Sequence, residues 1–536
     1  MIGARWLRGT PVGAPRWIGA VSGAAAAAVF LAVGELLDGV SRSIPSLVVA
    51  VGDFGIDTAD ARTTKVVIEW FGKNDKLALI IGIVIVTLLA GALIGIAGMT
   101  RRWIPPAVFL AFGIAGGLAA GRDPQANDWL GWLAAAVAAL SGWLSYELLR
   151  RRSATTIVAS GTDDDGPGEH DMQPTLLAPR FARGDFVNWA VGTVAVAVLG
   201  TFAGRWLRSR ASVSAERAEI ATRLPPPIAV SERPPATEPS LPGLSPYITP
   251  NEDFYRIDTA IAVPQIDPTS WRLQIGGMVE RPFEMTLDEI LAGDLVDETV
   301  TISCVSNEIG GDLVGNAVWT GIPLLPVLER AGIPTGANQV VGVSVDGWTA
   351  GFPIEVLDGE RTALIAVAMN GEPLPINHGF PARLIIAGLY GYVSATKWLA
   401  GIGLTGWDDF DGYWIPRGWS KEGPIKITSR IDTPRDGNRV ARGQVGIGGV
   451  AWAPTRGIGA VEVQINNDPW IPAKLGTVVS DETWVQWTAR PELEAGSHTI
   501  RVRAFDLAGE AQPIGPKPID PDGAEGYHSI RLAVEA

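Results

Sequence analysis

Apolar residues form five long runs within the first 210 residues, whereas towards the C-terminus they alternate with polar residues at strand spacing. The runs cover residues 17–37, 77–99, 103–120, 129–149 and 186–207. Each approaches the roughly 20 residues that a helix needs to cross about 30 Å of hydrocarbon. The first and third are rich in Ala and Gly, so a buried helix of a water-soluble protein is the alternative for them. We predict a membrane domain over residues 1–210 with about five transmembrane helices.

Arginines mark alternate ends of these runs, and such residues are retained on the cytoplasmic side of a membrane. They occur before the first run, between the second and third, and after the fourth (Arg5, Arg8, Arg16; Arg101, Arg102; Arg150, Arg151, Arg152). Five crossings of the cytoplasmic membrane then place the C-terminal part outside. Arginines at the end of the fifth run argue against this orientation (Arg205, Arg208, Arg210). Glu35 and Asp38 stand at the end of the first run in place of a cleavage site, so we expect this run to be a membrane anchor.

Three further segments follow the membrane domain. Residues 211–246 form a Pro-rich linker, either a spacer or a segment laid along the next domain. Residues 247–423 mix short strand-like runs with helical stretches at 287–292 and 323–331, which indicates an α+β domain. Residues 424–536 alternate at strand period, which predicts an antiparallel, immunoglobulin-like β-sandwich. Its core is expected from four tryptophans and their aliphatic neighbours (Trp452, Trp470, Trp484, Trp487).

Composition narrows the redox chemistry that is open to the chain. Its mean hydropathy of +0.20 and its net charge of −14 fit an acidic protein with a membrane part. The sequence has one cysteine and four histidines, and no histidine lies in an apolar run. Haem held by paired histidines within the bundle, haem attached through a CxxCH motif and iron–sulfur clusters held by several cysteines are therefore not expected. We expect no nucleic-acid partner.

The single cysteine, Cys304, follows a β-rich run and opens a polar turn at residues 306–311. A thiol at a strand end can be presented to a cofactor, because a turn leaves room for a bulky group. Composition alone favours the other interpretation, a buried and inert cysteine, because free cysteines are commonly small core residues.

This segment, together with residues 370–399 (NGEPLPINHGFPARLIIAGLYGYVSATKWL), resembles the molybdopterin-binding core of the sulfite oxidase family, and the resemblance extends over residues 245–536. It implies a molybdenum–molybdopterin cofactor with the Cys304 thiolate on the metal, a soft ligand for a soft centre. It further implies a catalytic group and a cofactor-binding group (Cys304, Asn307, Tyr413; Phe254, Tyr255, Arg256, Asp346, His378, Arg383, Thr396, Lys397). The resemblance also implies a C-terminal domain that forms homodimers.

Each of these residues has a simpler interpretation beside the functional one. The aromatic pair of the DFYRID segment could pack in the core, and Asp346 before Gly347 could only make a turn. A lone histidine is commonly structural, but His378 and Arg383, five residues apart around Gly and Pro, suit a phosphate-bearing cofactor. Lys397 could lie on the surface.

The sequence departs from the family at its substrate site. The family follows its cysteine with a CxGNRR-like pattern, whereas here Glu308 and Ile309 replace both arginines. Sulfite is a dianion that needs cations, so sulfite is disfavoured. Phe410 stands where a tyrosine is expected, and Tyr413 could substitute for it. The resemblance thus implies oxygen-atom transfer on another small substrate, such as a sulfoxide, with a separate electron-transfer partner. The alternative is a membrane-tethered binding or structural module without turnover.

Overall fold

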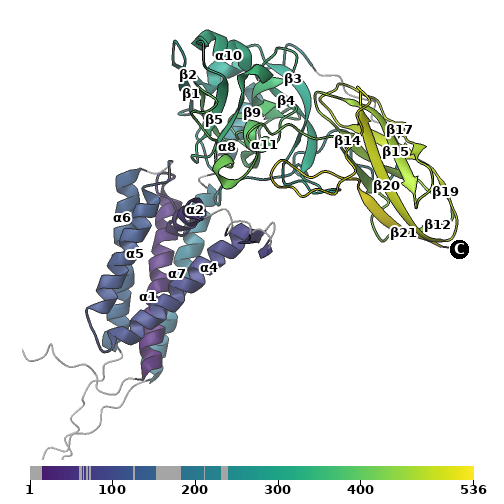
Figure 1. Cartoon of the computed structure of the whole chain (residues 1–536). Helices are drawn as coiled ribbons and strands as arrows, with labels where there is room; N and C mark the ends of the chain where they lie inside the picture. Colours follow the sequence, from purple (N-terminus) through teal and green to yellow (C-terminus); the bar gives the residue numbers. More distant parts are fainter. Residues whose placement is uncertain are drawn as a thin grey trace, which may run out of the picture. The chain divides into compact units, whose positions relative to one another are not determined.

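The computed structural model describes residues 15–535 except 60–62, 64–65, 68–69, 72–73, 125–126, 153–182, 211 and 231–238. The chain divides into two units, Met1–Ser212 and Val213–Ala536. The first contains helices and the second contains the β-rich part (Figure 1). The acidic stretch at 162–169, His170 and the N-terminal arginines before residue 15 lie outside the described residues.

The first unit is a bundle in which α1 lies against α4, α6 and α7 (Figure 1). Its helices are α1 (Arg16–Val40), α2 (Leu47–Thr58), α4 (Asp75–Gly98), α5 (Ile104–Ala120), α6 (Asp128–Arg152) and α7 (Arg183–Arg210). All five apolar runs form helices as predicted, and four of these helices are long and apolar enough to cross a membrane. The remaining helix, α5, is formed by the third run. It has 17 residues and is about 25 Å long, shorter than the roughly 30 Å of a full crossing.

Glycines let the bundle helices approach closely. A Cβ at Gly23 of α1 would lie 1.9 Å from the carbonyl oxygen of Gly91 on α4, and one at Gly95 would lie 2.0 Å from that of Gly19. Gly19 and Gly23 are four residues apart on α1, as are Gly91 and Gly95 on α4. This is the small-xxx-small spacing that brings membrane helices into backbone contact. The many small residues of the first run therefore serve helix packing.

The second unit begins with an α+β domain built on two five-stranded sheets (Figure 1). One sheet has the order β2-β1-β10-β5-β6, and the other has β3-β4-β7-β8 with β9 paired to β7. The elements are β1 (Arg272–Gly277), β2 (Phe283–Thr286), α9 (Leu287–Leu291), β3 (Val296–Ser303), β4 (Val314–Pro323), α10 (Leu324–Ala331), β5 (Gln339–Ser344), β6 (Thr349–Pro353), η2 (Ile354–Val356), β7 (Ala363–Met369), β8 (Glu372–Pro373), η3 (Ile376–His378), β9 (Arg383–Ile386), α11 (Gly391–Ser394), β10 (Leu399–Thr405) and η4 (Ile415–Arg417). The helices α9 and α10 form within a residue of their predicted bounds.

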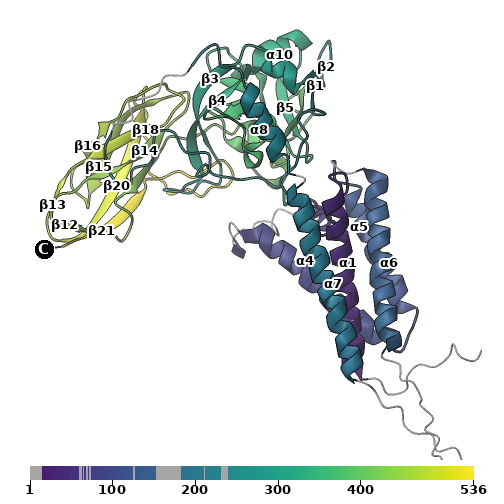
Figure 2. The same cartoon turned by 180° about the vertical axis from the view of Figure 1, so that it is seen from behind.

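The segment predicted as a Pro-rich linker is partly helical, because Ser214–Arg223 forms α8. Arg217 fixes this helix to the α+β domain: its Nη2 donates to the carbonyl of Pro373 at 2.6 Å, and it pairs with Glu372. Figure 2 shows α8 from behind. Beyond α8, the amide of Ile228 donates to the carbonyl of Leu295 at 2.7 Å. The described parts of this segment thus run along the domain, the second of the two alternatives.

The C-terminal domain is an immunoglobulin-like β-sandwich. Its two main sheets have the orders β11-β14-β18-β17 and β12-β21-β20-β15-β16, and β13 pairs with β19. The strands are β11 (Thr428–Thr433), β12 (Arg439–Ala441), β13 (Gly443–Gln444), β14 (Ile447–Trp452), β15 (Ile458–Ile465), β16 (Ile471–Pro472), β17 (Lys474–Leu475), β18 (Val485–Ala489), β19 (Glu492–Leu493), β20 (Gly496–Asp506) and β21 (Ser529–Glu535).

The tryptophans expected to fill the sandwich have different roles. Only Trp487 of the four lies in its core. Trp452 and Trp484 are buried against the α+β domain instead, where the backbone amide of Trp484 donates to the Thr301 hydroxyl at 2.7 Å. Trp470 is half-buried beside Tyr527. The prediction of a four-tryptophan core is therefore wrong, because two of these side chains join the domains.

Candidate functional site

Cys304 directly follows β3 and is a free, buried thiol with 8% of its surface exposed. Its backbone amide donates to the carbonyl of Leu313 at 2.9 Å, which closes the loop that follows. Burial raises the pKa of the Cys304 thiol, while hydrogen bonds from Ser306 and the charge of Lys397 oppose this rise. A thiol in this setting stays protonated unless a cation or a metal stabilises the thiolate.

The loop after Cys304 is held from inside by Asn307. This side chain is 7% exposed, and its Oδ1 accepts a hydrogen bond from the Leu313 amide at 2.9 Å. Asn307 thus shapes the thiol loop, and the catalytic role predicted for it stays a prediction.

The sandwich domain holds the same loop from outside. Nη1 of Arg430 donates to the carbonyl of Gly311 at 2.7 Å. Gly310 has a φ of +77°, and a Cβ there would lie 2.3 Å from the His528 ring. Ile309 packs against Gly526, where a Cβ would lie 2.6 Å from its Cδ1. The loop that carries the thiol is therefore shaped by both domains.

His378 and Arg383 come together with aromatic residues below them. Phe254 stacks on Tyr255 with ring centroids 5.3 Å apart and meets the edge of His378 at 5.7 Å. The guanidinium of Arg383 lies 4.9 Å from the centre of the Trp319 ring. The structure thus brings the two predicted aromatics beside the predicted His and Arg.

The protonation states of these groups follow from their burial. Burial lowers the pKa of His378 to about 4, helped by the nearby positive charges of Arg383 and Lys397, so the imidazole is neutral at pH 7. Its Nε2 lies 3.2 Å from the carbonyl oxygen of Asn251, which can only accept, so Nε2 carries the hydrogen and Nδ1 is left as an acceptor. Burial lowers the pKa of Arg383 to about 10, which leaves it charged. Burial also raises the pKa of Tyr255; a thiolate at Cys304 would raise this pKa further, and the charge of Arg383 lowers it.

Lys397 belongs to an ionic cluster with Asp258 and Arg256. Its Nζ donates to Oδ2 of Asp258 at 2.6 Å, and Nε of Arg256 donates to the same oxygen at 2.8 Å. Burial lowers the pKa of Lys397 to about 8, while Asp258 acts to raise it. Asp346 is half-buried, accepts from the Trp348 amide at 3.1 Å, and is within electrostatic reach of Asp258 and Lys397. Lys397 is thus no free surface lysine, and Arg256 is directed to a carboxylate of this chain.

Two predicted residues have other surroundings. Thr396 is fully buried, and its Oγ1 would lie 2.4 Å from a Cβ at Gly342 of β5. Tyr413 is half-buried, its amide donates to the carbonyl of Thr349, and the Arg417 guanidinium lies 3.7 Å above its ring. The roles predicted for Thr396 and Tyr413 stay predictions.

The residues present fit a phosphate-bearing organic cofactor beside the thiol. Within the described part of the chain, Nε of Arg383 and Oγ1 of Thr396 are buried without a hydrogen-bond partner. An unpaired buried donor costs about 1–3 kcal/mol unless a ligand satisfies it. The cluster also combines two cations, Arg383 and Lys397, with a thiol, the donor set that a phosphorylated, metal-bearing group requires.

Sequence reasoning missed several residues that shape this site. Asp258 lies within the DFYRID segment described above. Its position three residues after Tyr255 is the sequence feature that could have identified it. Arg430 and His528 come from the sandwich domain, more than a hundred residues from the loop they hold, and no local pattern marks them. Arg456, a turn residue of the sandwich, pairs with Asp506 and Glu510 within that domain.

Comparison with known proteins supports the same assignment. Residues 260–414 match the family described as "Oxidoreductase molybdopterin binding domain". The chain is 35% identical to the uncharacterized oxidoreductase YuiH of Bacillus subtilis, over 29% of this chain and 76% of that protein. It is 30% identical to mitochondrial sulfite oxidase of Drosophila melanogaster and 27% identical to that of Homo sapiens, over 50% and 51% of this chain.

The match covers a little more than half of each sulfite oxidase, 55% and 58% of their lengths. Among solved structures, the sulfane dehydrogenase SoxCD from Paracoccus pantotrophus is 19% identical with a TM-score of 0.48, over 57% of this chain and 90% of that chain. The matched residues contain Cys304, His378, Arg383 and Lys397, the cluster described above. The chain belongs to the sulfite oxidase family of molybdopterin-binding oxidoreductases.

Proposed function

We propose that the chain is a membrane-anchored, molybdopterin-dependent oxidoreductase that catalyses oxygen-atom transfer on a small substrate other than sulfite. The observation that carries the proposal is the single thiol of the chain, Cys304, buried at a strand end within electrostatic reach of Lys397 and Tyr255. An inert core cysteine has no need of a cation within reach of it, such as Lys397. This arrangement favours a thiolate that ligates a metal.

When bound, the molybdenum–molybdopterin group supplies two-electron chemistry in which a substrate X and water give XO, two protons and two electrons. Cys304 would hold the metal, and the charged Arg383 and Lys397 would hold the phosphate. Neutral His378 would accept a hydrogen bond at Nδ1 rather than donate one, because its Nε2 hydrogen is directed to Asn251. Phe254 and Trp319 keep water from the base of the site, since both are buried.

The substrate side argues against sulfite. Glu308 is exposed and adds a negative charge beside the thiol loop, and Ile309 is turned towards Gly526. A dianion would meet repulsion where the family has arginines. A neutral acceptor or donor of oxygen, such as a sulfoxide, is compatible with this surface.

The remaining parts of the proposal concern location and partners. The four long apolar helices would anchor the protein in the cytoplasmic membrane, with the second unit on the external side. Electrons would pass to a separate electron-transfer partner. The sandwich would form a homodimer.

Metal analysis tests the proposal directly. Full-length protein from a host that makes the cofactor should contain close to one molybdenum per chain, and Cys304→Ser should contain almost none while keeping its fold. His498→Gln is a matched control, because His498 hydrogen-bonds only within the sandwich, to Asn466 and Glu494. Wild-type protein without molybdenum would contradict the enzyme and support a non-catalytic tethered module.

Topology needs its own measurement. A reporter that is active only outside the cytoplasm, fused after the last residue, should be active. Activity of a cytoplasm-only reporter at the same position would overturn the external placement.

A further inference from the structure

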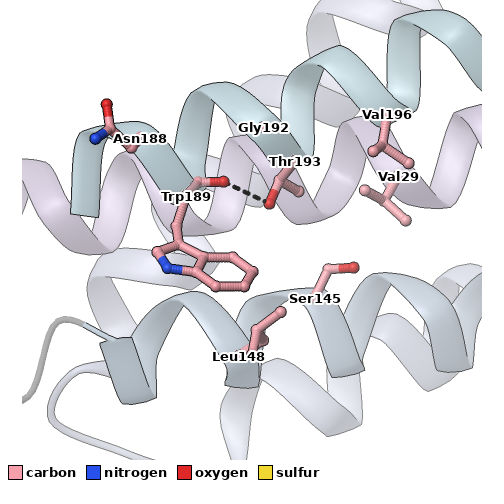
Figure 3. A pocket seen from close by; sticks show the side chains of 8 residues that line it. All are labelled: Val29, Ser145, Leu148, Asn188, Trp189, Gly192, Thr193 and Val196. Carbon is pink, nitrogen blue, oxygen red and sulfur yellow. Dashed lines mark hydrogen bonds between the residues drawn. The ribbon is translucent and has the colours of Figure 1, made fainter. Parts of the chain in front are cut away.

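A groove lies between α1, α6 and α7 of the helical unit, with a volume of about 470 Å³ (Figure 3). Its walls come from one residue of α1, two of α6 and five of α7 (Val29; Ser145, Leu148; Asn188, Trp189, Gly192, Thr193, Val196). In Figure 3 the Trp189 ring lies in the space between α7 and α6, above Leu148. The groove therefore opens along the side of helices that we place in the membrane.

Most of this groove is apolar. A Cβ at Gly192 would meet nothing within 4 Å, so the α7 backbone forms part of its floor. The Thr193 hydroxyl donates to the carbonyl of Trp189 at 2.8 Å, which satisfies it within the helix (Figure 3). Ser145 and Asn188 also line the groove, but its remaining walls are apolar or have this satisfied hydroxyl. Such a surface suits a hydrocarbon chain, because few polar groups have to be desolvated.

One end of the groove is basic. Arg152 lies four residues after Leu148 on α6, one helical turn further on the same face, and its guanidinium lies 4.5 Å from the centre of the Trp189 ring. Its neighbours Arg150 and Arg151 both bind Glu147, at 2.6 and 2.8 Å. Asp185 is an exposed residue one turn before Trp189 on α7, and its negative charge opposes these arginines. The three arginines still outnumber the two carboxylates, Glu147 and Asp185.

We propose that this groove binds an anionic phospholipid, with one acyl chain along Gly192 and Val196 and the phosphate at Arg152. The inference rests on the membrane placement proposed above. The arginine-bearing ends of the bundle are expected on the cytoplasmic side, the leaflet that carries anionic lipids. A guanidinium held over an aromatic ring is pre-organised for a phosphate, since its donor edges stay available.

Native mass spectrometry of the full chain in mild detergent tests this site, with phosphatidylglycerol and phosphatidylcholine of identical acyl chains as probes. Wild-type protein should retain phosphatidylglycerol in preference to phosphatidylcholine. Arg152→Ala should weaken phosphatidylglycerol binding about fivefold, which corresponds to about 1 kcal/mol for one basic residue at an anionic surface. Gly192→Leu should fill the groove and weaken both lipids.

Matched controls separate the site from general effects. Arg101→Ala removes a charge expected at the same membrane face, between α4 and α5. Gly82→Leu adds a side chain at another open helical glycine, on α4. Neither should change the lipid preference.

Each other outcome overturns the inference. Equal retention of the two lipids by wild type, or loss of the preference in the controls as well, would show that no specific site exists. The groove would be assigned to quinones if a short-chain quinone displaced the bound lipid only when Trp189 and Gly192 are intact. In that case Arg152→Ala would not change the displacement. Extraction of the chain from membranes by alkaline carbonate would instead refute the membrane placement itself, independently of lipid preference.

Discussion

Removing the Arg430 side chain should loosen the thiol loop from a distance. Arg430 joins three segments: Nη1 donates to the Gly311 carbonyl at 2.7 Å, Nε to Asp432 at 2.6 Å, and Nη2 to the Ser245 hydroxyl at 3.1 Å. The side chains of Arg430 and Asp432 are 11% and 7% exposed, so the ion pair is largely buried. This guanidinium is the charged contact through which the sandwich reaches the loop of Cys304.

The magnitude follows from that burial. Arg430→Met leaves Asp432 as a buried, uncompensated charge, which costs about 3–5 kcal/mol in the free energy of unfolding. The double variant Arg430→Met/Asp432→Asn removes the stranded charge, so the remaining cost is that of the lost charge-assisted hydrogen bonds, about 1.5–3 kcal/mol. The difference between the two variants separates the charge from the contact with the loop.

Hydrogen exchange of the full chain is the assay, read at residues 304–313. Both variants should increase exchange in this segment, and molybdenum per chain should fall with it. Arg503→Met is the matched control: its ion pair with Glu462 has side chains 25% and 28% exposed, so it should cost no more than about 1 kcal/mol and leave the loop unchanged. Unchanged exchange at 304–313 in the double variant would refute the idea that the sandwich shapes this loop.

Three further predictions concern titration and packing. Burial lowers the pKa of His378 from 6.5 to about 4, so between pH 4 and 6.5 the unfolded chain binds more protons than the folded chain. The protein should therefore lose stability as the pH falls from 6.5 to 4. His378→Gln should reduce this loss when melting temperature is measured against pH. Burial lowers the pKa of Lys397 from 10.5 to about 8, so the stability of cofactor-free protein should rise between pH 8 and 10.5. Asp258→Asn should make this rise begin at a lower pH, because Asp258 acts to raise the pKa of Lys397. A rise that begins at the same pH in both proteins would contradict the ion pair. Gly23→Leu should destabilise the bundle, since even a Cβ would lie 1.9 Å from a backbone oxygen of α4, whereas Gly82→Leu, facing open space, should leave the melting temperature of the helical unit unchanged.

The sequence predicted those parts of the fold that depend on local patterns. Apolar length identified the five helices, and strand alternation identified the sandwich, because burial imposes both periods on neighbouring residues. The thiol at the end of a strand was predicted in the same way, since β3 ends at Ser303. The helix α8 was missed because proline dominates its surroundings, although Ser214–Arg223 is rich in the helix formers Ala, Glu and Arg. A helix this short depends on tertiary contacts such as those of Arg217, which no local pattern reveals.

The site was predicted only as far as its residues carry recognisable chemistry. His378, Arg383 and Lys397 were identified through a family resemblance, and the structure brings all three into electrostatic reach of one another. The pairing of Lys397 with Asp258 joins residues 139 positions apart, and Arg430 reaches Gly311 across 119. Such contacts depend on how the strands are connected, so they could not be read from either segment alone.

The departures from the family pattern after Cys304 have a structural reason as well as a chemical one. Ile309 packs against Gly526, and the next residue, Gly310, lies directly against the ring of His528. A long cation at position 309 would have to leave this contact or bury its charge there, which is unfavourable without a partner. The exposed Glu308 is under no such constraint. The apolar residue at 309 therefore belongs to the docking of the sandwich on the thiol loop.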